Sequence, residues 1–226
     1  MHLNLIKMAY KAVIVGASGL IGRHLVNNLL LSKEYTEVTS LARKKVPIHS
    51  SKLKQIIVDF DRLDEYAEHI NGRAIFCCLG TTLNKTPNLD EYRRIDHDYP
   101  VIMAELGLQN GVEQFHLVSS IGADPNSSSF YPQLKGETEE DVKKVGITRL
   151  HIYRPSLLVG ARTESRKLER IAIKLMVMLN PLLIGPFKKY RSIEAKTVAQ
   201  AIFKQSLKKT KEGVFTYPSD QIKKLA

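Results

Sequence analysis

The sequence predicts an α/β protein built on one doubly wound parallel sheet, and three observations support this prediction. Short apolar runs alternate along the chain with stretches of helical periodicity. The first run, residues 12–15, leads directly into three glycines spaced three apart within residues 16–22. Further alternation continues almost to the end of the chain. We therefore expect residues 1–226 to form a single domain, with a small C-terminal lobe that begins near residue 155.

The glycine spacing is typical of a turn between a buried strand and the start of a helix. Gly16 allows a tight turn, Gly19 leaves no Cβ in the way of a pyrophosphate, and Gly22 lets the helix lie close to the strand. Backbone N–H groups at the helix start then bind phosphate. Besides Gly16 and Gly19, the residues expected to contact a bound dinucleotide here are Ser18, Leu20 and Ile21. The alternative is a tight turn with no ligand.

The second predicted strand, residues 37–42, ends at a basic pair, Arg43 and Lys44. In dinucleotide-binding folds an acid at this position binds the ribose 2'-hydroxyl of NAD, whereas an arginine favours the 2'-phosphate of NADP. Arg43 can bind a phosphate through two N–H groups, and Lys44 adds a point charge. We therefore expect NADP(H) as the cofactor. An exposed basic turn is the alternative.

The third apolar run, residues 55–58, is followed by Asp59 and Phe60. Asp59 could accept a hydrogen bond from the adenine amino group while the N–H of Phe60 reaches a ring nitrogen. Asp59 could equally cap the helical stretch at residues 63–70. The sequence does not separate these two uses.

The fourth apolar run, residues 74–79, ends in glycine and threonine, which let backbone approach a ligand and supply hydroxyl groups beside the nicotinamide ribose. The residues expected to contact the cofactor here are Leu79, Gly80 and Thr81. The only cysteines, Cys77 and Cys78, are adjacent in this strand and point to opposite faces. We interpret both as core residues without a disulfide.

A long helical stretch, residues 90–109, precedes the fifth predicted strand at residues 114–118. That strand delivers Ser119 and Ser120 at its end. His116 lies inside the strand, and we interpret it as a packed or surface histidine rather than a catalytic one.

Tyr131 and Lys135 are four residues apart in a predicted helix, so their side chains share one face. An ammonium group beside a tyrosine stabilises the phenolate and lowers the phenol pKa from about 10, so that the tyrosine can exchange a proton with a carbonyl oxygen. The same ammonium can bind the nicotinamide ribose. A hydroxyl from Ser120, or alternatively Ser119, would orient the substrate oxygen. Pro132 is compatible with a first helical turn.

These motifs together carry a family resemblance over about residues 9–207. In chain order they are GASGLIG, VDFDRLDEYA, FCCLGTT, residues 94–99, FHLVSSIGAD, YPQLKGE and YRPSLLVG. The chain resembles the atypical short-chain dehydrogenase/reductases related to the Tat-interacting oxidoreductase, whose bacterial relatives include NAD(P)H-binding and epimerase-like proteins. The resemblance implies a Rossmann fold with bound NADP(H). It also implies that Ser120, Tyr131 and Lys135 stand at the reductase triad positions.

The substrate side departs from the family pattern. Residues 83–87 lack the small, glycine-containing run expected there, and the interval from Ser120 to Tyr131 is shorter than in sugar epimerases. Pro155 follows the sixth predicted strand, residues 149–154. In related enzymes this proline-led turn packs by the nicotinamide, so we expect Pro155 to contact the cofactor.

The C-terminal third contains a basic amphipathic stretch at residues 165–179. Such a stripe usually closes a core, and a substrate lid, a dimer face or a peripheral membrane contact are the alternatives. Residues 180–190 are expected to be a loop, residues 194–207 a helix, and residues 214–217 an edge strand.

The net charge of +11 makes an anionic partner conceivable, but the lysines are dispersed and few aromatic residues lie among them. We therefore expect no specific nucleic-acid binding. No metal-ligand cluster and no transmembrane segment is evident. The first residues lack the apolar core and cleavage site of a signal peptide, and the cysteine pattern suits a reducing compartment, so we expect a cytoplasmic protein, as a monomer or homodimer.

The leading functional hypothesis is an NADP(H)-dependent oxidoreductase acting on an unidentified carbonyl or alcohol. Tyr131 would be the acid/base, Lys135 would tune its pKa and bind the ribose, and Ser120 would orient the carbonyl. The alternative is an NADP(H)-binding regulatory or interaction protein with little or no catalysis.

Overall fold

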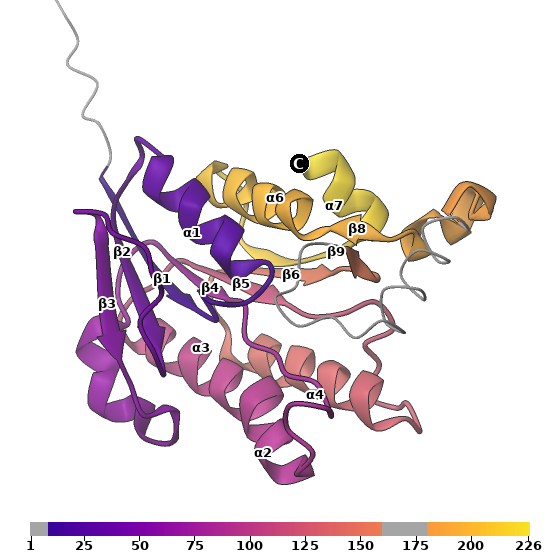
Figure 1. The fold of residues 1–226 in the computed structure, drawn as a ribbon, viewed down its shortest axis with the longest axis horizontal. Coiled ribbons are helices and arrows are strands. Elements are labelled where there is room, and N and C mark those ends of the chain that lie inside the picture. Colours follow the sequence, from indigo (N-terminus) through magenta and orange to yellow (C-terminus); the bar gives the residue numbers. More distant parts are fainter. Residues whose placement is uncertain (1–8, 160–179) are drawn as a thin grey trace, which may run out of the picture.

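A computed structural model describes residues 9–159 and 180–226. Within them the chain forms a seven-stranded parallel sheet of order β3-β2-β1-β4-β5-β6-β9 (Figure 1). The strands are β1 (Tyr10–Val15), β2 (Tyr35–Ala42), β3 (Leu53–Ile57), β4 (Ala74–Cys77), β5 (Gln114–Val118), β6 (Arg149–Arg154) and β9 (Gly213–Pro218). The strand order reverses between β1 and β4, which is the arrangement of a doubly wound sheet. The predicted fold class is confirmed.

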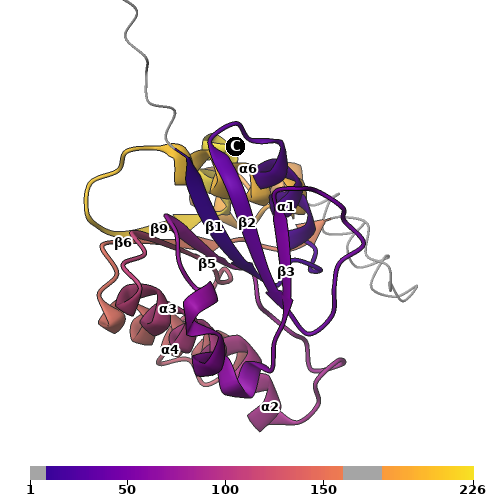
Figure 2. The same cartoon turned by 90° about the vertical axis from the view of Figure 1, so that its left-hand side faces the viewer.

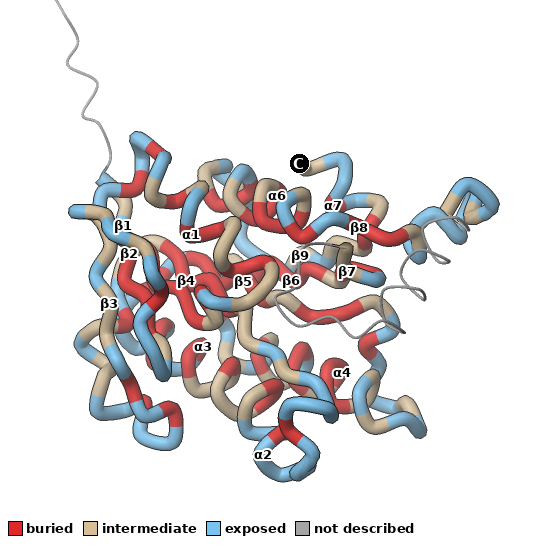
Figure 3. Tube along the Cα trace, in the orientation of Figure 1, coloured by how far each residue is buried: buried red, intermediate tan, exposed pale blue. Residues whose placement is uncertain are grey.

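Helices cover both faces of the sheet, as Figures 1 and 2 show from two directions. One layer contains α1 (Gly22–Leu31), α6 (Ala195–Leu207) and α7 (Ser219–Leu225). The other contains the 3₁₀-helix η1 (Phe60–His69), α3 (Tyr99–Gln109) and α4 (Phe130–Val145). Buried residues lie along the central strands and on the helix sides that face them (Figure 3). This two-sided cover explains why the strands are nearly continuous apolar runs.

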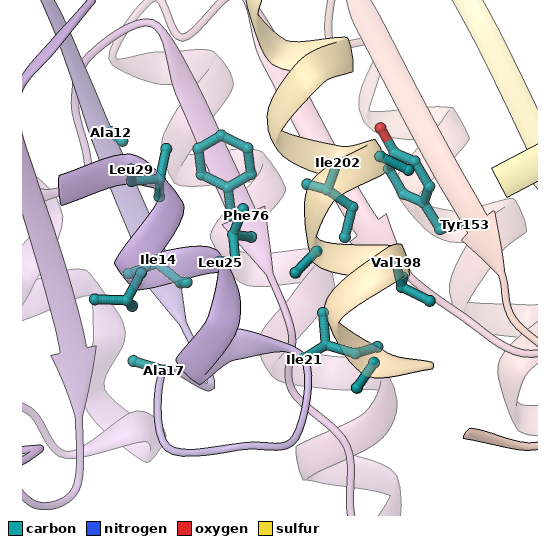
Figure 4. Close-up of a cluster of buried hydrophobic side chains, with 14 of the residues drawn as sticks. Ala12, Ile14, Ala17, Ile21, Leu25, Leu29, Phe76, Tyr153, Val198 and Ile202 are labelled. Carbon is teal, nitrogen blue, oxygen red and sulfur yellow. The ribbon is translucent and has the colours of Figure 1, made fainter. Parts of the chain in front are cut away.

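The core beneath α1 and α6 shows how the helical pattern produces packing. Ile21, Leu25 and Leu29, which are four residues apart, are all buried. They lie with Val198 and Ile202 of α6 in one cluster over the sheet (Figure 4). Burial of one such side chain contributes roughly 1.5–3 kcal/mol. This packing holds the start of α1, and with it the glycine turn, against the end of β1.

The long helix predicted at residues 90–109 is interrupted. It consists of α2 (Leu89–Arg93), a π-helical turn, η2 (Arg94–Asp98), and α3. Pro100, in the first turn of α3, has no N–H to donate to the carbonyl of Asp96 four residues earlier, so a regular α-helix cannot continue through this point. The helical pattern of residues 90–109 did not indicate this π turn.

The C-terminal residues mostly join the main layers. The predicted edge strand is β9, and the predicted helix is α6. Two short elements were not predicted: β7 (Leu158–Val159) and β8 (Ile193–Glu194), which pair as a separate two-stranded sheet. Between them, the expected loop contains the 3₁₀ turns η3 (Asn180–Leu182) and η4 (Gly185–Tyr190).

The basic stretch expected at residues 165–179 lies outside the described residues, and the C-terminal lobe stays a prediction. In the part of the chain that is described, no helix has the length and apolar character needed to cross a membrane.

Candidate functional site

The glycine turn connects β1 to α1 and packs against the end of β4. Gly16 has φ +80°, and a Cβ there would collide with the carbonyl of Cys78. A Cβ on Gly22 would collide with the carbonyl of Gly16. Gly16 and Gly22 are therefore required by packing, in agreement with the turn and close approach inferred from the sequence.

The N-terminus of α1 has the features of an anion site. Its N-cap, Ile21, offers no side-chain hydrogen bond, and no acidic residue lies in the first turn. The N–H groups at this end are thus not capped by a side chain, and the helix dipole favours a negative group beside them. Ser18, between the glycines, is exposed. The chemistry of this turn fits a dinucleotide pyrophosphate.

Arg43 and Lys44 follow β2 at the same carboxyl edge of the sheet. Both are exposed, and neither makes an ion pair or hydrogen bond within residues 9–159 and 180–226. Their loop is held by Gln55 of β3, which accepts from the Val46 N–H at 2.7 Å and donates to the Val46 carbonyl at 3.2 Å. Arg43 and Lys44 are therefore positively charged side chains without partners in the described part of the chain, on a loop that Gln55 holds in place.

Asp59 is the N-cap of η1, because its Oδ1 accepts from the N–H of Asp61 at 3.0 Å. The capping interpretation of Asp59 is therefore confirmed, and the adenine contact stays a prediction. Phe60 is buried, and its ring lies against Tyr99 with the centroids 5.3 Å apart.

The loop after β4 is fixed through Thr81. Its N–H donates to Asp96 Oδ1 at 2.7 Å, and its carbonyl accepts from the Tyr92 hydroxyl at 3.2 Å. Its own hydroxyl shares a 2.8 Å hydrogen bond with that of Thr86. The threonine hydroxyl that the sequence analysis expected beside the ribose is thus already paired. The preceding Leu79 is half-buried and Gly80 is exposed.

Cys77 and Cys78, which precede that loop, form no disulfide. Burial raises the pKa of the Cys77 thiol to about 12, and it also raises the pKa of Cys78. Both thiols are protonated at neutral pH, as expected for core cysteines.

The two serines after β5 are not equivalent. Ser119 Oγ donates to Glu139 Oε1 at 2.6 Å, and Glu139 is buried and bound by the Arg154 guanidinium. Ser120 Oγ is also buried, but it has no hydrogen-bond partner in the described part of the chain. A buried hydroxyl without a partner costs about 1–3 kcal/mol, so a ligand atom that bonds it is favoured. Of the two serines left open by the sequence, Ser120 is the one with an unused hydroxyl.

The chain after Ser120 is packed against α4. A Cβ on Gly136 of α4 would collide with the backbone of Pro125, and the N–H of Asp124 donates to the Pro132 carbonyl at 3.0 Å. The N–H of Ile121 donates to the Pro155 carbonyl at 2.9 Å. The residues after β5 and β6 are therefore fixed to each other and to the first turn of α4.

Tyr131 and Lys135 lie on α4, whose first turn contains Tyr131 and Pro132. Tyr131 is 41% exposed, whereas Lys135 is only 4% exposed. Burial alone would lower the pKa of Lys135, but Asp96 and Tyr131 outweigh it, and the pKa is raised. Lys135 is thus a protonated, buried ammonium on the same helix as the exposed Tyr131, which acts on it electrostatically.

Asp96 is the site residue that the sequence analysis missed. Its Oδ2 lies 2.9 Å from Lys135 Nζ, and its side chain is almost completely buried. The carboxylate thereby joins Lys135 to the loop after β4. The signal that could have indicated this position is Pro100, because a proline within a helical pattern marks an irregular turn four residues earlier.

His116 is packed in the core, as predicted. Its ring stacks between Phe76 and His151, with centroids 4.9 and 4.7 Å apart. Burial lowers its pKa well below 6.5, so the imidazole is neutral.

The chain is similar to proteins of one known family. A family model described as NAD(P)H-binding matches residues 16–149. The rat (Rattus norvegicus) protein HTATIP2 is 41% identical over 173 residues, which are 74% of this chain and 71% of that protein. The fmp52 protein of Aspergillus clavatus is 31% identical over 202 residues, or 86% of each chain. The resemblance found in the sequence is therefore confirmed.

Solved structures agree on the fold. The Bordetella bronchiseptica enzyme WbmH, in complex with NAD⁺, superposes with a TM-score of 0.70 at 14% identity, covering 96% of this chain and 79% of that one. At this identity the likeness speaks for the Rossmann fold alone.

One expectation is wrong. The fungal relatives are named mitochondrial proteins, which contradicts the cytoplasmic location inferred from the sequence. That inference rested on the missing signal-peptide pattern and on unpaired cysteines. Neither feature distinguishes the cytoplasm from another reducing compartment.

Proposed function

Because the chain belongs to the NAD(P)H-binding family, we propose that it is an NADP(H)-dependent oxidoreductase of the short-chain dehydrogenase/reductase type, acting on a carbonyl or alcohol. The observation that carries the proposal is the buried Ser120 hydroxyl, which has no hydrogen-bond partner among the described residues. The loop after Ser120 is bonded to the first turn of α4, the helix that carries Tyr131 and Lys135. A hydroxyl without a partner, a phenol and an ammonium are the groups that carbonyl reduction requires.

The preference for NADP(H) over NAD(H) is supported by the charges after β2. Arg43 and Lys44 are exposed and uncommitted on a loop that Gln55 holds in place. A guanidinium binds a phosphate through two parallel hydrogen bonds, and a preorganised loop loses little entropy on binding. The 2'-phosphate is the group that these cations would bind.

The chemistry assigns one task to each side chain. NADPH, held by the glycine turn and by Arg43 and Lys44, would supply the hydride that reduces the carbonyl carbon. Tyr131 gives the phenolic proton to the carbonyl oxygen, Ser120 donates a hydrogen bond to that oxygen, and Lys135 stabilises the phenolate that remains. The product is an alcohol. Residues after Pro155 would provide the substrate side of the same domain.

The experiment is a turnover screen of the purified protein with NADPH and a panel of aldehydes and ketones, monitored by loss of nicotinamide absorbance. Oxidation of NADPH that requires a carbonyl, and that the Tyr131→Phe variant lacks, supports the proposal. NADPH binding without turnover on any carbonyl would contradict it. That outcome would favour the alternative, a cofactor-binding regulatory protein, whose affinity for a partner should then depend on NADPH.

A further inference from the structure

We propose that Asp96 is a positioning residue of this site, whose carboxylate holds the Lys135 ammonium and ties it to the loop after β4. The proposal rests on the proposed function, because it assigns Asp96 a part in the same reaction. Asp96 acts through Lys135 and need not touch the substrate. The predicted triad would thereby depend on a fourth side chain.

The burial of both charges is the first argument. The side chains of Asp96 and Lys135 are 1% and 6% exposed, and their charged atoms are 2.9 Å apart. An isolated charge at such a depth is strongly disfavoured, so each group needs the other. The other carboxylate oxygen of Asp96, Oδ1, accepts a hydrogen bond from the Thr81 N–H at 2.7 Å. The lysine is therefore linked through one carboxylate to the loop expected to contact the ribose.

The backbone of Asp96 is the second argument. Because Pro100 lacks an N–H, the Asp96 carbonyl is not needed for a regular helical hydrogen bond at that position. Instead it lies 3.0 Å from the Thr138 hydroxyl of α4, whose single proton is shared with the Leu134 carbonyl at 2.7 Å. Single π turns occur frequently at functional sites. Here both the side chain and the main chain of one residue in the π turn bind the helix that carries Lys135.

Two neighbouring contacts join α4 to α2 and to the π turn. Arg93 pairs with Glu137 at 2.7 Å, and His97 Nε2 lies 3.0 Å from Asp141 Oδ2. Glu137 and Asp141 stand on α4 close to Lys135. The distance between the two helices is thus maintained by other pairs, so a change at Asp96 alters the charge beside Lys135 more than it alters the helix packing.

The groups that raise the pKa of Lys135 show what Asp96 contributes. They are Asp96 from the π turn, Tyr131 from α4 itself and Cys77 from β4, and Asp96 is the carboxylate among them. Cys77 is a neutral thiol at working pH. Without the carboxylate, burial would dominate and would favour loss of the lysine proton. An uncharged lysine could not stabilise a Tyr131 phenolate.

The test compares Asp96→Asn with wild type and with Asp98→Asn, a control that removes a more exposed carboxylate from the same turn. Thermal unfolding is measured from pH 7 to pH 10, which requires neither cofactor nor substrate. In wild type the raised Lys135 pKa contributes stability that is fully present below the ordinary lysine pKa of about 10.4 and is lost only as the pH rises through the raised value. In Asp96→Asn the Lys135 pKa is lowered, so that the unfolded state binds more protons and stability rises with pH.

We therefore expect Asp96→Asn to lower the Tm by roughly 6 °C or more at pH 7, and this deficit to shrink by at least half at pH 10. The control should show no such pH dependence. A deficit that stays constant across the range, or no deficit, would overturn the proposal. If Asp96→Asn does not fold, the double variant Asp96→Asn/Lys135→Met is used to test whether the two residues act as a pair. Recovery of folding supports the pair, and failure to recover overturns it.

The catalytic readout is separate. Once a carbonyl substrate is found, Asp96→Asn should lower kcat at least tenfold with KM within about twofold, and Asp96→Glu should restore part of the loss. An unchanged kcat would overturn the positioning role even if the unfolding result holds. Absence of turnover in wild type would instead contradict the proposed function, while the unfolding experiment would still test the ion pair.

Discussion

Ser119 donates a 2.6 Å hydrogen bond from its Oγ to Glu139, and this contact commits the hydroxyl of Ser119 to the protein interior. Glu139 in turn is bound by Arg154, with its Oε2 2.6 Å from the guanidinium Nη2. The adjacent Ser120 hydroxyl has no such partner among the described residues. The Ser119 hydroxyl therefore bonds within the protein, whereas the Ser120 hydroxyl is available to a ligand.

The first prediction follows from this difference. Ser120→Ala removes a buried hydroxyl that has no partner, so the free energy of unfolding should change by less than about 1 kcal/mol while kcat for carbonyl reduction falls at least tenfold. Ser119→Ala removes a donor to a buried carboxylate and should cost about 1–3 kcal/mol of stability. Chemical denaturation and steady-state kinetics on both variants test the assignment. The reverse pattern, with Ser119→Ala catalytically impaired and fully stable, would contradict it.

The second prediction concerns the proton donor. Tyr131→Phe should reduce turnover about 10²- to 10⁴-fold, the range usual for a general acid. The Kd for NADPH should stay within about threefold, because the phenol hydroxyl is assigned to the substrate. Tyr92, which donates to the Thr81 carbonyl at 3.2 Å, provides the matched control. Tyr92→Phe should retain the greater part of the turnover. Equal losses in the two variants would show that Tyr131 has no special role.

The third prediction concerns acid stability. Burial lowers the pKa of His151 from 6.5 to about 4, and lowers that of His116 as well. The unfolded chain therefore binds more protons than the folded one between these values, and stability falls as the pH drops from about 6.5 toward 4. The loss from His151 should be roughly 3 kcal/mol, measured by urea unfolding at several pH values.

The control for this pH dependence is His151→Phe, which keeps a ring beside Phe215 and removes the titrating group. Its unfolding free energy should fall less steeply over the same interval. A slope equal to that of wild type would show that other groups, such as paired carboxylates, cause the acid sensitivity.

Much of the fold could be predicted because parallel strands covered on both faces are nearly continuous apolar runs. The strand at Gln114–Val118 was predicted with its observed bounds, and β4 ended two residues earlier than expected, at Cys77. The two-residue strands β7 and β8 are too short to leave a periodic pattern.

The candidate site was only partly predictable. Spacing places Tyr131 and Lys135 on one helix face, because their relation is local. Pro100 marks an irregular turn at Asp96, but the pairing of Asp96 with Lys135 joins residues far apart in the chain, so no local pattern indicates the partner. Nor could the sequence distinguish Ser119 from Ser120, since the difference lies in Glu139, which α4 brings to the end of β5.

The fourth prediction addresses the central claim, that the chain binds NADP(H) and selects it through the basic pair after β2. A fluorescence titration with NADPH and with NADH measures this directly. We expect NADPH to bind at least tenfold more tightly, a difference of about 1.4 kcal/mol. The Arg43→Ala variant should lose most of this preference with little change in its affinity for NADH. Lys11→Ala is the control, because Lys11 lies at the start of β1 and the glycine turn follows the other end of that strand. Equal affinities for the two nucleotides would contradict the specificity, and no binding of either would contradict the account as a whole.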